Sequence, residues 1–165
     1  MKAFFNFLLA GILFTSCGCS KENIGEQLPP ATQIGANTFG CKVNGVVYSC
    51  KGTWDPKNFL ITDGVYAYIS ENRLRINALI KKNIFHDGWN MTIDFDFIER
   101  KEGIYTNNIK FQGQETYPDY ESKIEITKFD NNMVAGKFQL KFQFENNPTR
   151  TYEFTEGRFD IKLKN

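Results

Sequence analysis

Residue types on which catalytic and metal sites depend are scarce in this chain. It has one histidine, His86, and none of its four cysteines belongs to a CxxC pair. A structural zinc site takes about four nitrogen or sulfur ligands, and a general base needs an oriented partner and a nucleophile within reach. His86 stands in the segment Phe85-His86-Asp87-Gly88, where we expect a solvated turn between two strands. The sequence therefore predicts no metal site, no cofactor and no enzymatic activity.

Charge of one sign is not in excess either. Twenty Lys and Arg residues face 19 Asp and Glu residues, for a formal net charge of +1. Proteins that bind nucleic acid need a clustered basic surface to neutralise phosphates. We therefore expect no nucleic-acid partner.

A hydrophobic run long enough to span a membrane is also missing. The longest apolar segment, from Ala3 to Phe14, is interrupted by Asn6 and Gly11. A transmembrane helix needs roughly 20 apolar residues. With Lys2 before it, the segment has the composition of a secretory signal sequence. We expect residues 1–16 to be a lipoprotein signal peptide.

The next residues, Phe14-Thr15-Ser16-Cys17, are typical of a bacterial lipobox. We expect Cys17 to carry the lipid, with Cys19 as the alternative acceptor. Acyl chains anchor a protein stably because each buried methylene contributes about 0.8 kcal/mol. The sequence predicts an outer-membrane lipoprotein, on the periplasmic face or the cell surface, that contacts the membrane through its N-terminal lipid.

Residues 17–38 are predicted to be the lipidated cysteine and a polar tether. The segment contains Pro29-Pro30 and shows neither the helical nor the strand period. About 19 flexible residues would reach on the order of 25 Å. We expect removal of residues 20–38 to leave the stability of the domain unchanged.

Residues 39–165 have the apolar period of two that is typical of half-buried β-strands. The pattern is clearest around Asn44-Gly45, a dipeptide that favours a type I′ hairpin turn, and it recurs at Leu74–Ile80, Met91–Phe97, Ile124–Ile126, Phe138–Phe144 and Phe159–Leu163. The fold class is therefore predicted to be all-β, an antiparallel sandwich or closed barrel of roughly eight to ten strands. Lys162 and Lys164 in the last strand are typical of a sheet edge.

Two groups of oxygen-bearing side chains deserve comparison with known chemistry. Asp94 and Asp96 share one face of a strand, and paired carboxylates serve glycoside hydrolysis or bind calcium. Their alternation with Ile93 and Phe95 predicts that they face solvent. Asp130-Asn131-Asn132 also offers oxygen ligands, but the segment suits a tight turn and lacks the spacing of a calcium loop.

Cys41 and Cys50 flank the Asn44-Gly45 turn and are candidates for a disulfide, which persists outside the cytoplasm. A two-residue turn pairs Cys41 with Tyr48 and Phe39 with Cys50. The cysteines then lie diagonally, with Cα atoms about 7–8 Å apart, beyond the usual disulfide range of about 4.4–6.8 Å. The sequence leaves two alternatives: a disulfide, if a β-bulge brings the two cysteines closer, or two separate thiols.

Aromatic residues supply the candidate ligand contacts. Tyr117-Pro118-Asp119-Tyr120 is the best of them, because a loop would expose both the Tyr117 and the Tyr120 ring to a sugar or peptide. Most of the others are expected to be core residues or cross-strand pairs: Trp54, Tyr66, Tyr68, Trp89 and Tyr105.

Three segments resemble a family of Bacteroidota cell-envelope lipoproteins with a domain of unknown function. They are LPPATQIGANTFGCKVNG at 28–45, GIY at 103–105, and the stretch from Ile126 to Leu163, which contains ITKFDNNMVAGKF and TEGRFDIKL. The resemblance covers nearly the whole mature chain. It implies a secreted, lipid-anchored, β-rich protein, and it implies no activity or site residues.

Three functional hypotheses follow. The first is a non-enzymatic, lipid-anchored envelope protein whose domain binds or scaffolds a protein, a glycan or a small apolar ligand. The alternative is a lipocalin-like carrier that holds a small apolar ligand in a β-barrel cavity of about 300–1,000 Å³. The third and weakest is a hydrolase that uses Asp94 and Asp96. A filled core favours the first, an apolar cavity the second, and convergent carboxylates the third.

Overall fold

The computed structural model describes residues 27–53, 64–80, 91–96, 100–106, 108–111, 114–115, 122–144 and 147–163, with the backbone alone at 94–96, 114–115, 144 and 147–148. Of these residues 72% lie in strands and none in a helix, and all strand pairs in the two sheets are antiparallel. The predicted all-β class is confirmed.

The larger sheet has six strands in the order β2-β1-β11-β10-β9-β6. Its members are β1 (Thr38–Val43), β2 (Val46–Lys51), β6 (Gly103–Tyr105), β9 (Lys123–Phe129), β10 (Met133–Phe144) and β11 (Asn147–Lys162). The C-terminal strand β11 thus lies inside the sheet, between β1 and β10. The prediction that Lys162 marks an edge strand is wrong, because strand order follows pairing and not sequence order.

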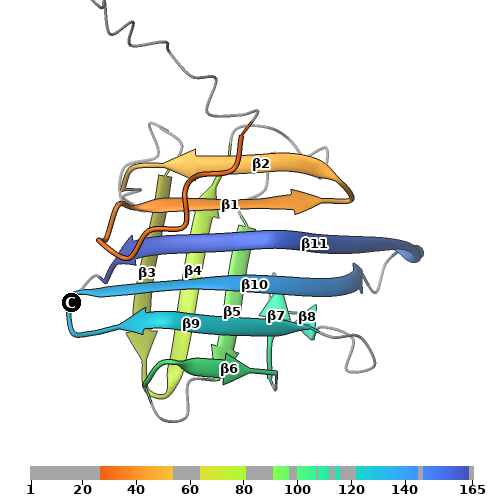
Figure 1. Cartoon of the computed structure of the whole chain (residues 1–165). Helices are drawn as coiled ribbons and strands as arrows, with labels where there is room; N and C mark the ends of the chain where they lie inside the picture. Colours follow the sequence, from red (N-terminus) through yellow and green to blue (C-terminus); the bar gives the residue numbers. More distant parts are fainter. Residues whose placement is uncertain are drawn as a thin grey trace, which may run out of the picture.

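The smaller sheet has five strands in the order β3-β4-β5-β7-β8. They are β3 (Gly64–Ser70), β4 (Arg73–Leu79), β5 (Met91–Asp96), β7 (Lys110–Phe111) and β8 (Gln114–Glu115). The two sheets form two layers whose strands run across one another (Figure 1). Single parallel bridges, Thr53 with Val65 and Ala67 with Leu163, connect β3 to the ends of the larger sheet. The sheets do not close into a barrel, so the sandwich is the correct alternative of the two predicted.

Aromatic and branched side chains fill the space between the layers. Phe111 of the smaller sheet lies 4.4 Å from Phe142 and 4.8 Å from Phe154 of the larger sheet, measured between ring centroids. Ile76 and Ile93 on the facing layer are also buried. Alternation predicted the inward positions of Phe142, Ile76 and Ile93, and their burial confirms it. Phe111 and Phe154 were not among the predicted positions.

Turn chemistry fixes the hairpins. Asn44 and Gly45 both have positive φ, 48° and 82°, as a type I′ turn requires, and Cys41 pairs with Tyr48 as predicted. Between β9 and β10, Asp130 Oδ1 accepts hydrogen bonds from the N–H groups of Asn132 and Met133. Asp130 therefore shapes a turn, which confirms that prediction.

Residues 27–37, which we call the strap, differ from the predicted tether. They lie across the outer face of the larger sheet, in front of β2, β1 and β11 (Figure 1). Pro29 packs over Gly40, where an added Cβ would come within 2.4 Å of its ring. Thr38 already belongs to β1. The assignment of residues 17–38 to a tether is therefore wrong from residue 27 onward. The strap lacks the alternating apolar pattern of a strand because it joins no β-ladder, and side chains of the sheet such as Asp160 and Arg158 bind it instead.

Candidate functional site

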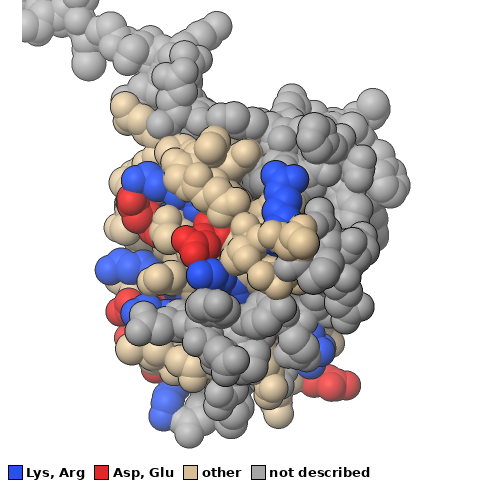
Figure 2. Space-filling view, turned by 90° about the vertical axis from the view of Figure 1, so that its right-hand side faces the viewer, with Lys and Arg blue, Asp and Glu red and all other residues tan. Residues whose placement is uncertain are grey.

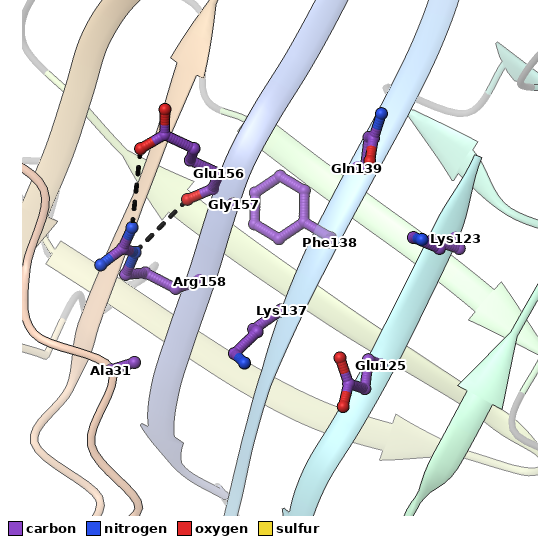
Figure 3. Close-up of a pocket in the computed structure, with 9 residues that line it drawn as sticks. All are labelled: Ala31, Lys123, Glu125, Lys137, Phe138, Gln139, Glu156, Gly157 and Arg158. Atoms are coloured by element: carbon purple, nitrogen blue, oxygen red, sulfur yellow. Dashed lines mark hydrogen bonds and ion pairs between the residues drawn. The ribbon is translucent and has the colours of Figure 1, made fainter. Parts of the chain in front are cut away.

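A surface hollow of about 310 Å³ lies on the outer face of the larger sheet, over β9, β10 and β11. Ala31 of the strap forms one wall of the hollow, and Phe138 and Gly157 are the other uncharged, apolar residues that line the hollow. Five charged side chains and one amide surround these three residues (Figure 3). They are Lys123, Glu125, Lys137, Gln139, Glu156 and Arg158.

A β-bulge in the central strand β11 shapes this hollow. The pairing of β11 with β10 jumps between Gly157 and Phe154, and its pairing with β1 jumps between Arg158 and Thr155. Inside the bulge Glu156 has a φ of 52°. A non-glycine residue in this region costs on the order of 1–3 kcal/mol, and such residues cluster at functional sites. Bulges re-aim side chains next to binding and active sites, and the hollow coincides with this irregular point of the sheet.

Position 157 requires a glycine because the ring of Phe138, its partner on the neighbouring strand, occupies the space that a side chain would take. A Cβ on Gly157 would lie 2.5–2.6 Å from three atoms of that ring. Phe138 cannot move aside freely, because its ring stacks on Phe39 at 5.3 Å and lies 6.4 Å from Phe159. The missing side chain at position 157 thus admits Phe138.

The polar groups on the strap side of the hollow are paired. Glu156 forms ion pairs with Lys42 and, at 3.9 Å, with Arg158. Arg158 also donates to the carbonyl oxygen of Pro29 in the strap over 3.3 Å. The side chains of Lys123, Glu125 and Lys137, on the opposite side, are exposed and make no hydrogen bond or ion pair with any described residue. These three are the charged groups available to a ligand.

Asp160 holds the strap in place. Only 1% of its surface is exposed, and its carboxylate accepts hydrogen bonds from Thr32 Oγ1 (2.5 Å), Ile34 N (3.1 Å) and Gly35 N (2.7 Å). Burial by itself raises the pKa of Asp160, but the hydrogen bonds from Thr32 and from the backbone N–H groups of residues 34–36 together lower it by more, so the pKa is below its ordinary value. Because the strap supplies Ala31 and Pro29, this carboxylate also supports the wall of the hollow.

Cys41 and Cys50 are two separate buried thiols. Phe39 is paired with Cys50 and Cys41 with Tyr48, which places the cysteines diagonally as predicted. Cys41 Sγ lies 4.0 Å from Met91 Sδ, and Cys50 Sγ lies 3.5 Å from the carbonyl oxygen of Gly64. Burial, and secondly the proximity of Cys50, raises the pKa of the Cys41 thiol. Of the two alternatives, the structure shows the unbridged one.

Other candidates lie outside the described residues: Cys17, Cys19, Trp54, His86, Trp89, Tyr117 and Tyr120. For Asp94 and Asp96 the structure describes the backbone, which pairs them with Arg75 and Arg73 of β4. Their carboxylates lie outside the description, so their predicted solvent exposure stays a prediction.

The outer face of the smaller sheet carries two of the aromatic candidates. The rings of Tyr66 and Tyr68 are nearly parallel, with centroids 5.9 Å apart, and Arg75 donates to the Tyr68 hydroxyl over 2.9 Å. Next to them Asn77 Oδ1 accepts a hydrogen bond from Thr92, while the buried Asn77 Nδ2 has no hydrogen-bond partner among the described residues. The two tyrosines are neighbours on the half-buried outer side of β3, so the prediction of a core residue or a cross-strand pair is wrong for them.

Glu156, Gly157 and Asp160 were not predicted as site residues. The signal that would have found the bulge is the glycine inside the alternating segment TEGRFDIKL, since an isolated glycine in a strand marks a bulge or a close approach. Asp160 carried no such signal, because its outward position in the alternation is also that of an ordinary solvated carboxylate.

Comparison of the chain with family models, with curated proteins and with solved structures finds no match. No helix among the described residues is long and apolar enough to cross a membrane. Within the same residues, no three His, Cys, Asp or Glu side chains are grouped as metal ligands would be. The described side chains around the hollow are suited to binding through charge and hydrogen bonds.

Proposed function

We propose that this chain is a lipid-anchored cell-envelope protein whose β-sandwich binds a ligand in the outer-face hollow without transforming it. The observation that carries the proposal is the hollow itself, built by the bulge at Glu156 and walled by the strap. The carrier alternative requires an apolar cavity between the sheets. The hollow lies instead on the outside and is surrounded by charged side chains.

Because the strap is part of the folded domain, the flexible segment between the lipid and the domain is shorter than the sequence predicted. Ser49 Oγ of β2 donates to the carbonyl oxygen of Gln27 over 3.4 Å, so the chain joins the sheet near β2. With Cys17 lipidated, about ten residues would separate the lipid from this point, and such a length spans about 17 Å as a flexible chain. The β2 edge would then lie close to the membrane, with β6 at the opposite edge of the sheet.

Two measurements test the proposal. Cys17→Ser should abolish labelling by a palmitate analogue and release the protein from the membrane fraction. Undiminished labelling would contradict the choice of Cys17, and Cys19→Ser is the matched control.

Binding is tested on the lipidated protein in mild detergent by amide NMR. Glucose, glucuronate, inorganic phosphate and a neutral tripeptide serve as probes. A ligand in the hollow should shift the amide signals of Lys137, Gly157 and Arg158 and spare those of β3 and β4. A panel in which no probe moves these signals would contradict the binding function.

A further inference from the structure

The hollow contains more cationic than acidic side chains, although the chain as a whole is nearly neutral. Lys123, Lys137 and Arg158 stand against Glu125 and Glu156, and Lys42 shares the carboxylate of Glu156 from outside the hollow. On the side of the molecule drawn in Figure 2, the described Lys and Arg residues are intermixed with Asp and Glu. The lining of the hollow has an excess of one cationic side chain.

The internal ion pairs decide which of these charges face a ligand. Glu156 is neutralised by Lys42 and Arg158, and Arg158 is further held by Pro29. On the other side, the Lys123 and Lys137 ammonium groups have no hydrogen-bond or ion-pair partner among the described residues. Glu125 is the one lining carboxylate that is likewise unpaired there. Two ammonium groups and one carboxylate are left for the ligand.

The strand register places these groups around one point. Lys137 of β10 stands directly between Glu125 of β9 and Arg158 of β11, and Lys123 stands opposite Gln139. Lys123 and Lys137 are thus diagonal neighbours on one face, about 7–8 Å apart at Cα, within reach of one shared anion for side chains of this length. Figure 3 shows Lys137 near the ring of Phe138, and Lys123 on β9, on the other side of β10 from that ring.

From this arrangement we infer that the hollow recognises its ligand through an anionic group, a carboxylate or a phosphate, held by Lys123 and Lys137 with Arg158 beside them. The Gln139 amide contributes a neutral hydrogen bond, and the uncharged surface at Ala31 and Gly157 accommodates the body of the ligand. The inference rests on the proposed binding function and adds its ligand class. Acidic sugars and phosphate-bearing headgroups share this chemistry.

The experiment compares charged and neutral members of matched pairs on the lipidated protein in mild detergent, by titration calorimetry at low salt. Glucuronate is compared with glucose, and glycerol 3-phosphate with glycerol. We expect the anionic member of at least one pair to bind at least tenfold more tightly than its neutral partner. Added salt should weaken this binding, because exposed charges are screened. Preference for one pair identifies the source of the anion, a sugar acid or a headgroup.

Single substitutions test which side chains bind the anion. Lys137→Gln and Lys123→Gln should each weaken anion binding about fivefold, and Glu125→Gln should strengthen it. Lys141→Gln is the control, because Lys141 lies on the same strand but pairs with Glu153 at 2.7 Å, outside the hollow. Neutral probes that bind the hollow as tightly as anions would overturn the anion inference and leave the binding function standing. Anion binding that Lys141→Gln weakens as much as Lys137→Gln would also overturn it. If no probe binds, both fall.

Discussion

Replacing Asp160 by Asn is the sharpest test of how the strap is held. The substitution keeps the size of the side chain and removes the negative charge of the carboxylate, which accepts hydrogen bonds from Thr32, Ile34 and Gly35. A hydrogen bond to a charged group contributes about 1.5–3 kcal/mol. The strap can detach and be hydrated, which limits the loss, so we expect a decrease in the free energy of unfolding of about 2–4 kcal/mol. For a domain of this size that corresponds to about 10 °C in Tm.

The effect should depend on pH in one direction. The pKa of Asp160 is lower in the folded protein than in the unfolded chain. Its stabilisation is therefore fully present above the ordinary carboxyl pKa of about 3.9 and is lost as the pH falls through the folded value. The difference in unfolding free energy between wild type and Asp160→Asn should stay constant from pH 7 to about pH 5 and shrink as the pH falls below about 4.

Urea denaturation monitored by circular dichroism gives these numbers. Glu153→Gln is the control, a carboxylate on the same strand in an exposed pair with Lys141, where we expect a change within about 0.5 kcal/mol. Deleting residues 27–36 should destabilise as much as Asp160→Asn, while deleting residues 20–26 should not. An Asp160→Asn variant as stable as wild type at pH 7, or equally destabilised at pH 3 and pH 7, would refute the reasoning.

Two further predictions concern the core. Gly157→Ala should lower the free energy of unfolding, measured by urea denaturation, by about 2–4 kcal/mol, because the added methyl overlaps the Phe138 ring. Adding Phe138→Leu should recover part of this loss. A loss under about 0.5 kcal/mol would disprove the contact. Cys41 and Cys50 should resist iodoacetamide in the native state up to about pH 9 and react fully in urea, since burial raises the pKa of Cys41. Peptide mass spectrometry separates them from Cys17 and Cys19, and native labelling of either at the rate of a free thiol would contradict their burial.

The parts of the fold that follow from local chemistry could be predicted from the sequence. Asn44-Gly45 specifies its own turn, and that turn alone fixes the pairing of Cys41 with Tyr48. Alternation gave the inward side of β4, β9 and β10, because a strand with one buried face must place every second residue in the core. These predictions needed no knowledge of which strands are neighbours.

What the sequence could not supply depends on long-range contacts. The place of β11 between β1 and β10 joins residues more than a hundred positions apart, and no local pattern encodes it. The strap is the same kind of case, since Thr32 and Asp160 are 128 residues apart. Residues 27–37 looked like a linker because they join no β-ladder and their hydrogen bonds go to scattered groups that are distant in the sequence, among them the side chains of Asp160 and Arg158. The hollow depends on both contacts and was therefore not predicted.

Three departures from regular strand structure fall within five residues of β11: the positive φ at Glu156, the glycine at 157 and the buried carboxylate at Asp160. Each has a cost on its own, through strain, lost side-chain packing or desolvation. Together they shape the floor of one hollow and fix its wall. A central strand needed only for the sandwich would have no reason to concentrate these costs. For that reason we place the ligand here and not on the regular face of β3 and β4. A ligand that contacts the strap side should also stabilise the strap, because binding and docking are linked.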